Sequence, residues 1–180
     1  MSLEGAVTAP VLVQPDYVRL LARYNLWQNR SLLAAADSLE DAARVADRGA
    51  FFRSIAGTLS HLLWGDLIWM SRFDGGEKPA GGIAGSDGLF TDWAGYKAVR
   101  VGTDLRIIEW AEQLQPDDLS GDLIWFSAAL GQTVTRPKGL LVAHMFNHQT
   151  HHRGQVHAML TAAGTRPGDT DLFIMPDLVS

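Results

Sequence analysis

The sequence contains no cysteine among its 180 residues. Disulfides, thiolate zinc sites, iron–sulfur clusters and cysteine nucleophiles are therefore excluded, and metal ligands have to come from His, Asp or Glu. This composition is typical of a cytoplasmic protein, which is our expectation for its location. Since 47% of the residues are hydrophobic, a chain of this size forms one core without help from a metal. We therefore expect any bound metal to take part in the protein's function rather than in its folding.

Basic surfaces and long apolar segments are also missing. The chain has 15 Lys and Arg against 20 Asp and Glu, a formal net charge of −5, and no long run of like charges. Because nucleic-acid binding uses a basic face, we expect no nucleic-acid partner. No apolar run approaches the roughly 20 residues that cross a bilayer, so we expect no membrane partner. Residues 1–14 lack the basic start of a signal peptide and are predicted to be a flexible leader.

Apolar residues recur at helical spacing in four segments. These segments run from Pro15 to about Leu39, from about Gly49 to Phe73, from Thr91 to about Pro116, and from Pro137 to Ala163. Residues 74–90 hold six glycines and predict a long connecting loop. Residues 120–136 are rich in β-formers on either side of Gly131 and predict a short β-hairpin. We therefore expect an all-α fold with a single domain over residues 15–180. It should be a four-helix bundle with a long connection between its second and third helices and a hairpin before the last.

Five of the six histidines lie in the last of these helical segments, between residues 144 and 157. At about 100° per residue, His148 and His152 lie about 40° apart on one face, with His144 about 40° to the other side. This arc is otherwise apolar and should face the interior. Interior histidines can be hydrogen-bonded core residues, but neutral imidazoles at positions i and i+4 can also chelate one divalent ion. Gln155 falls on the same face, where it could orient a ligand.

A third ligand can come from His61, in the middle of the second predicted helix. Ser54, Gly57 and Gly65 lie within about 40° of it. These small residues would either leave room for a metal and its ligand or permit close helix packing. Three neutral histidines with open coordination positions are typical of a catalytic site for Zn, Ni, Fe or Mn. Water bound to such an ion has a lowered pKa and could act as base or nucleophile.

Other polar residues are weaker candidates. Tyr24 and Asn25 place polar atoms on the inward side of the first helix and could contact a ligand. His144 can belong to the pocket and serve proton transfer, because three histidines spread over two helical turns cannot all reach one ion. Asp66 lies about 140° from His61 and is predicted to be a capping or surface partner rather than a ligand.

Three stretches of the sequence carry a resemblance to a known family. They are Tyr24-Asn-Leu-Trp27, His61-Leu-Leu-Trp-Gly-Asp66 and His148-Gln-Thr-His-His152-Arg-Gly-Gln155. With them the chain resembles the DinB/YfiT-like family, whose members are regarded as metalloenzymes. The resemblance implies a four-helix bundle with a divalent metal on His61, His148 and His152. The additional His144 and His151 leave open whether one of them replaces a named ligand.

The expected function follows from this site and from the resemblance. Some related bundles are S-transferases that use the thiols bacillithiol or mycothiol, and many relatives are homodimers. We therefore expect a homodimeric metal-dependent enzyme acting on a small molecule, either a thiol transferase or a hydrolase. The alternative is a non-catalytic stress-response or binding module whose metal site is sensory or vestigial. No residue identifies the substrate.

Overall fold

The computed structural model describes residues 12–90 and 92–176. Of the predicted leader, residues 1–11 lie outside the described residues. Val13 is buried, and it packs with the apolar residues at one end of the molecule.

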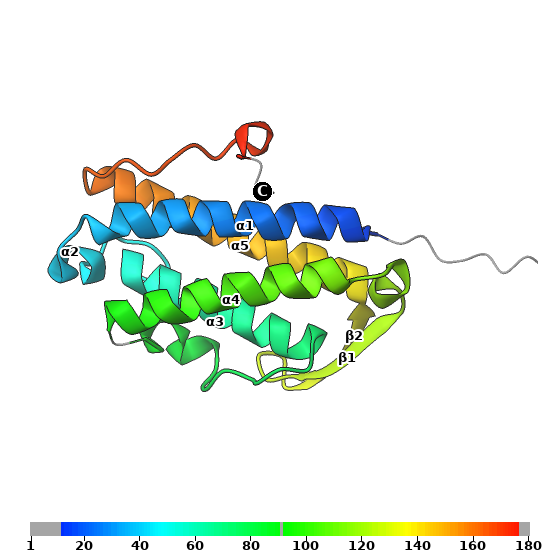
Figure 1. Ribbon diagram of the computed structural model, residues 1–180. Helices are drawn as coiled ribbons and strands as arrows, with labels where there is room; N and C mark the ends of the chain where they lie inside the picture. Colours follow the sequence, from blue (N-terminus) through cyan, green and yellow to red (C-terminus); the bar gives the residue numbers. More distant parts are fainter. Residues whose placement is uncertain (1–11, 91, 177–180) are drawn as a thin grey trace, which may run out of the picture.

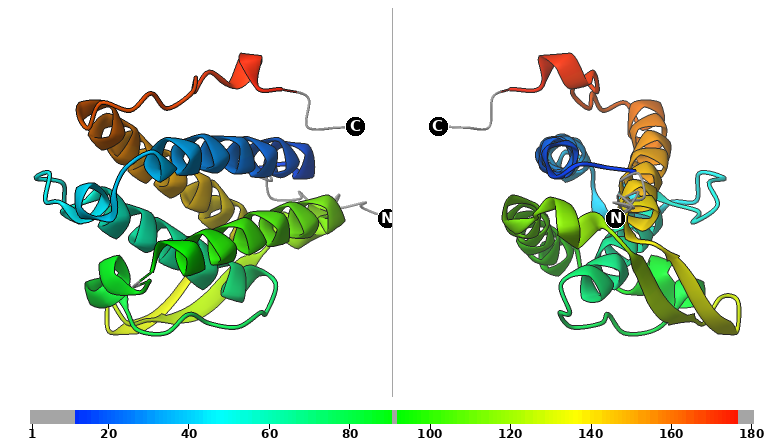
Figure 2. Two further views of the ribbon diagram at one scale, coloured as in Figure 1. Left: turned by 60° about the vertical axis from the view of Figure 1, so that its left-hand side comes forward. Right: turned by 90° about the vertical axis from the view of Figure 1, so that its right-hand side faces the viewer.

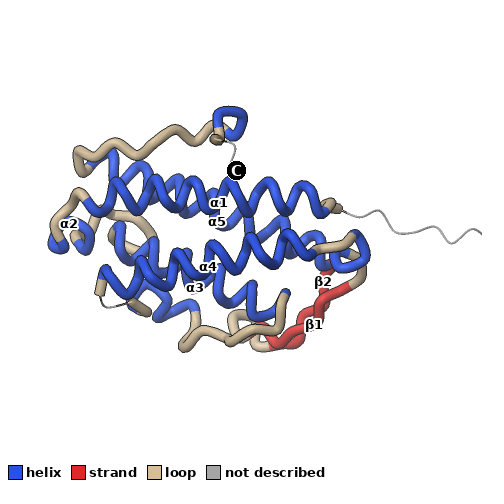
Figure 3. The backbone as a smooth tube through the Cα atoms, in the orientation of Figure 1, coloured by secondary structure: helices blue, strands red, loops and turns tan. Residues whose placement is uncertain are grey.

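The structure is mostly helical with one small hairpin, as predicted (Figures 1 and 3). The α-helices are α1 (Pro15–Asp37), α2 (Asp41–Val45), α3 (Ile55–Phe73), α4 (Trp93–Gln113) and α5 (Lys138–Ala162). Short 3-10 turns are η1 (Ile83–Gly88), η2 (Pro116–Leu119) and η3 (Leu172–Ile174), and the strands are β1 (Asp122–Ser127) and β2 (Gln132–Pro137). Helices α1 and α3 each pack against both α4 and α5, and Figure 2 shows the four long helices side by side from two further directions. None of the described helices combines the length and the apolar composition needed to cross a membrane.

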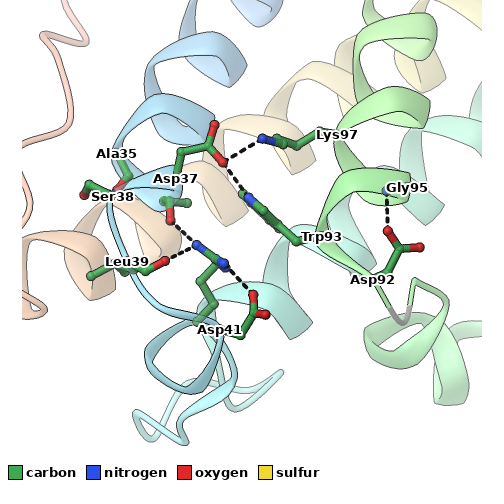
Figure 4. A network of polar contacts seen from close by, with 11 residues as sticks. Ala35, Asp37, Ser38, Leu39, Asp41, Asp92, Trp93, Gly95 and Lys97 are labelled. Carbon is green, nitrogen blue, oxygen red and sulfur yellow. Dashed lines mark hydrogen bonds and ion pairs between the residues drawn. The ribbon is translucent and has the colours of Figure 1, made fainter.

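The helix starts follow local capping chemistry. The side chain of Ser54 accepts a hydrogen bond from the N–H of Gly57 at the start of α3. Asp92 does the same for the N–H of Gly95 at the start of α4 (Figure 4). Such caps satisfy N–H groups that have no partner within the helix. Thr91, the expected start of this helix, lies outside the described residues.

The second predicted helix begins later than expected, and the short helix α2 (Asp41–Val45) ahead of it was not predicted. The prediction placed the start near Gly49, whereas α3 begins at Ile55. The residues before it form a tight turn in which Arg53 has a positive φ of 65°. Phe52 of this turn is buried. Its apolar side chain fits the helical spacing of the residues that follow, so the pattern predicted a helix that begins too early.

Polar contacts join the ends of α1 and α4 (Figure 4). Asp37, the last residue of α1, accepts hydrogen bonds from Trp93 Nε1 at 2.6 Å and from Lys97 Nζ at 2.8 Å. Arg44 of α2 lies over the Trp93 ring at 5.0 Å and donates to the carbonyl of Leu39. The short α2 is therefore held against the main helices by its arginine.

The hairpin packs on the helices through its inner face. In its antiparallel register Trp125 lies opposite Val134, which is buried. The Trp125 ring meets Trp69 of α3 edge-on at 5.8 Å. The turn contains Gly131, whose φ of 65° favours glycine. The predicted hairpin before the last helix is confirmed.

The core divides into two apolar clusters separated by a polar layer. One cluster includes Ala22, Met70, Ile107 and Met145, and the other includes Leu32, Leu63, Tyr96 and Val156. Between them each long helix contributes buried polar residues. We call these residues the polar layer: Asn25 and Asn29 of α1, Asp66 of α3, Arg100 and Asp104 of α4, and Gln149 and Arg153 of α5.

Candidate metal centre

Three histidines from two helices converge beside the polar layer. His61 lies in the middle of α3, and His148 and His152 lie one turn apart on α5. One ring nitrogen of each can be chosen so that all three lie within 4.8 Å of one another. Only 5% of His61 and 7% of His152 is exposed, and His148 is half-buried. The structure thus brings together the three residues named as candidate ligands.

The spacing of the ring nitrogens fits a shared ion. The Nε2 atoms of His61 and His148 lie 3.2 Å apart. Two imidazoles that bind one zinc ion at about 2.0–2.1 Å have nitrogens about 3.0–3.4 Å apart, depending on the coordination angle. The His61 and His148 rings therefore already have the separation of neighbouring ligands.

A serine fixes the proton of His61. Its Nδ1 atom lies 2.8 Å from the hydroxyl oxygen of Ser86, and this hydroxyl donates its own hydrogen to the carbonyl of Ile83 at 2.7 Å. Ser86 can consequently only accept from His61, so the imidazole proton belongs on Nδ1. The Nε2 lone pair is left free toward His148. Ser86 was not identified from the sequence because it lies in η1, which the glycine-rich connection brings against α3.

Gln155 fixes the proton of His152 in the same way. The His152 Nδ1 atom lies 2.8 Å from Gln155 Oε1, a carbonyl oxygen that can only accept. The Nε2 lone pair of His152 is thus also available to a metal. The Gln155 amide also contacts His151 Nε2 at 3.3 Å. Hydrogen bonds to the second ring nitrogen orient histidine ligands in many metal sites.

Burial keeps the three imidazoles neutral. Burial, together with repulsion from the nearby His152, lowers the pKa of His61 to about 4. Burial lowers the pKa of His148 to about 3, with added repulsion from His152 and His61. The pKa of His152 is also lowered by burial. Because metals bind the deprotonated nitrogen, these shifts keep the ligands ready at neutral pH.

The small residues beside His61 have separate roles. A Cβ atom at Gly65 would lie 2.9 Å from His148 Cε1, so this glycine makes room for the His148 ring. A Cβ atom at Gly57 would lie 2.4 Å from the Phe52 carbonyl oxygen. That close approach lets the Phe52 ring stack on His61 at 3.8 Å between ring centres. The small residues were expected to leave space for a metal and its ligand. Beside Gly65, this space is occupied by the ring of His148.

The two additional histidines lie at the edge of the cluster. Both His144 and His151 are exposed. The His144 ring lies 6.0 Å from the His148 ring and 5.3 Å from Trp69. The His151 ring contacts His152 at 4.9 Å. Neither belongs to the group of three that could hold an ion among the described residues.

Tyr24 and Asn25 make their hydrogen bonds away from the histidines. Tyr24 donates to the carbonyl of Thr170 at 2.7 Å. Asn25 donates to Asp104 at 3.2 Å and accepts from Arg153 within the polar layer. Helical spacing identified Asn25 as facing inward but could not show which partners the neighbouring helices supply.

The prediction that Asp66 is a surface or capping residue is wrong. Asp66 is fully buried and accepts from Arg100 at 2.5 Å and from Gln149 at 2.7 Å. Arg100 also donates to Asp104 at 2.7 Å. Burial by itself would lower the pKa of Arg100, but the negative charges of Asp104 and Asp66 outweigh it and raise the pKa. Since Gln149 follows His148 directly, the Asp66–Gln149 hydrogen bond also fixes the position of α5 relative to α3.

The chain is similar to a known protein family, to a relative in sequence and to a solved structure. The model of the DinB family matches residues 12–178. The Bacillus subtilis (strain 168) protein called Protein DinB is 28% identical over 169 residues, which cover 87% of this chain and 91% of that protein. A crystal structure of a DinB-like protein from Bacillus cereus ATCC 10987 matches with a TM-score of 0.55 and 17% identity. The match covers 79% of this chain and 90% of the other.

Proposed function

Because the chain belongs to the DinB family, we propose that it binds one divalent metal ion through His61, His148 and His152 and uses it for catalysis. The four long helices would form the four-helix bundle that supports the site. The observation that carries the proposal is the convergence of neutral imidazoles, with two Nε2 atoms 3.2 Å apart and two protons fixed on Nδ1 atoms.

The chemistry supported by the ligand set is metal-assisted transfer or hydrolysis. Three neutral ligands leave the charge of a bound Zn, Ni, Fe or Mn ion uncompensated, and such an ion acts as a Lewis acid and lowers the pKa of coordinated groups. The Phe52 ring excludes water from one side of His61. His144 is exposed near His148 and is placed to move a proton to or from a substrate. Transfer of a low-molecular-weight thiol is the reaction that we favour, with hydrolysis as the second.

Metal analysis of protein purified without an affinity tag tests the binding step. We expect about one equivalent of a single divalent metal per chain and its loss in His148→Ala. His157→Ala is the matched control, because this histidine lies on the same helix outside the group of three. Equal metal content in both variants would contradict the proposed ligands.

A thiol-consumption screen tests the catalytic step. The metal-loaded protein would be incubated with low-molecular-weight thiols and an electrophile, beside the His148→Ala variant. Thiol loss that depends on His148 supports the transferase. If the wild-type protein binds metal but consumes no thiol and hydrolyses no ester or amide, the non-catalytic binding module is the better description.

A further inference from the structure

A second candidate site lies on the other side of α5 from the three histidines. A cavity of about 320 Å³ opens between α1 and α5. Its lining includes Thr150, Gly154 and His157 of α5. At about 100° per residue these positions lie roughly 180–240° around the helix from His148. The cavity is therefore separate from the proposed metal centre.

The chain segment that follows α5 closes one side of this cavity. It runs back along α1 (Figure 1) and is held there by three hydrogen bonds. Tyr24 donates to the Thr170 carbonyl at 2.7 Å, and Gln28 donates to the Asp169 carbonyl at 2.8 Å. The N–H of Gly168 donates to Ser31 at 2.8 Å. Tyr24, Gln28 and Thr170 all line the cavity, so this segment is part of its wall.

Arg153 supplies a positive charge to the cavity. Only 6% of the residue is exposed, and it lines the cavity beside the Tyr24 ring, which lies 5.5 Å from its guanidinium carbon. Its hydrogen-bond acceptors are neutral: Asn25 Oδ1, and Thr150 Oγ1 at 3.4 Å. None of the ion pairs among the described residues involves Arg153, since the buried carboxylates of Asp66 and Asp104 pair with Arg100 instead. The guanidinium group of arginine stays protonated in proteins, so the cavity wall carries a cation.

The rest of the wall suits a small organic molecule. Leu32 and Ala158 provide apolar surface, and His157 provides a further polar group. A Cβ atom at Gly154 would meet nothing within 4 Å, so this glycine leaves the cavity open. The volume lies at the lower end of the range of ligand pockets, which begins at about 300 Å³.

We propose that this cavity binds a small anion, whose carboxylate or phosphate group is held by Arg153 while its body packs against Leu32 and the Tyr24 ring. Guanidinium groups have five N–H donors and bind both oxyanions through charge-assisted hydrogen bonds. Two of the Arg153 donors are used within the protein. An anion in the cavity would accept from the others and pair directly with the charge.

The test is a titration of the full-length protein with benzoate and with inorganic phosphate, followed by amide NMR shifts. We expect saturable shifts at Gly154, His157 and Thr170 with at least one probe, and the tighter probe identifies the anion class. Gly154→Leu should weaken binding at least tenfold by filling the cavity. Gly102→Leu is the matched control, because it is an exposed helical glycine of α4 that also faces open space.

Several outcomes would overturn the proposal. They are the absence of saturation with both probes, equal affinity in Gly154→Leu and Gly102→Leu, and binding that disappears in His148→Ala instead. The last result would place the anion at the metal centre. If Gly154→Leu does not fold, Gly154→Ala replaces it, since one methyl group narrows the cavity while favouring the helix. An unchanged affinity in Gly154→Ala and in His157→Leu would then also contradict the site.

Discussion

The imidazole of His148 packs directly against Gly65, so that a Cβ atom at this glycine would lie 2.9 Å from His148 Cε1 and 3.3 Å from Nδ1. Glycine inside a helix costs up to about 1 kcal/mol relative to alanine. Here it allows a ring on α5 to approach the backbone of α3 closely. The position of a candidate ligand thus depends on a residue that binds nothing.

We predict that Gly65→Ala lowers metal affinity at least about tenfold, although alanine favours the helix. The added methyl group must displace the His148 ring, which changes its distance to His61. Competition with a chelator measures the affinity. Gly102→Ala should leave metal affinity unchanged, because this position faces open space. Equal affinities in the two variants would show that the His148 ring adapts freely.

Ser86→Ala should lower metal affinity about 10- to 100-fold, the usual effect of removing a hydrogen bond to a histidine ligand. Without the acceptor, His61 can rotate and place its proton on either nitrogen. Ser86→Thr keeps the hydroxyl and should retain more of the affinity. Isothermal titration of metal into each variant distinguishes these outcomes, and wild-type affinity in Ser86→Ala would exclude the orienting role.

His144→Ala and His152→Ala should differ strongly in metal affinity. The first should bind nearly as the wild type does, because His144 is exposed and lies outside the group of three. The second should lose most of the affinity. Metal titration under identical conditions gives the ranking, and the reverse order would show that His144 and His148 form the chelating pair.

Removal of the Asp66 side chain should destabilise the fold severely. In Asp66→Ala the buried Arg100 loses one of its two carboxylate partners, and breaking a buried ion pair costs about 3–5 kcal/mol. Lys97→Ala breaks the exposed pair with Asp37 and should cost about 1 kcal/mol or less. Urea unfolding followed by circular dichroism compares the two. Similar midpoints would show that the polar layer adds little stability.

The stability of the metal-free protein should fall as the pH decreases from about 6.5 to about 4. In this range an unfolded chain protonates its histidines, whose ordinary pKa is about 6.5, whereas folded His61 and His148 stay neutral. The unfolded state then binds more protons, so the unfolding free energy rises with pH through this window and is retained above it.

Urea unfolding at several pH values, with EDTA present, measures this effect. Carboxylates also titrate in acid, so the wild type is compared with His148→Gln, which lacks one of the depressed imidazoles. The variant should show the shallower decline. Parallel curves would mean that His148 titrates normally in the folded protein.

The sequence alone determined the main elements and the three candidate ligands. Helical periodicity depends on neighbours three and four residues away, so the four long helices, the hairpin, and the shared face of His148 and His152 were all predicted. The place of His61 beside them followed from the family resemblance and from the small residues around it. The predicted start of the second helix was wrong, because the buried Phe52 fits the apolar spacing of α3 although it lies in the turn before Ile55.

Only the tertiary structure decided which polar groups meet. Ser86 reaches His61 across 25 residues of chain, and Gln149 reaches Asp66 across 83. The sequence shows that such residues are polar, but not that a partner from another helix lets them be buried. Pairing across helices depends on how the helices pack, which no local pattern records. Thus the sequence identified the candidate imidazole ligands. The packing of the helices decided which ring nitrogens carry the protons and how strongly burial favours the neutral form. It also formed the cavity beside Arg153 on the other side of α5.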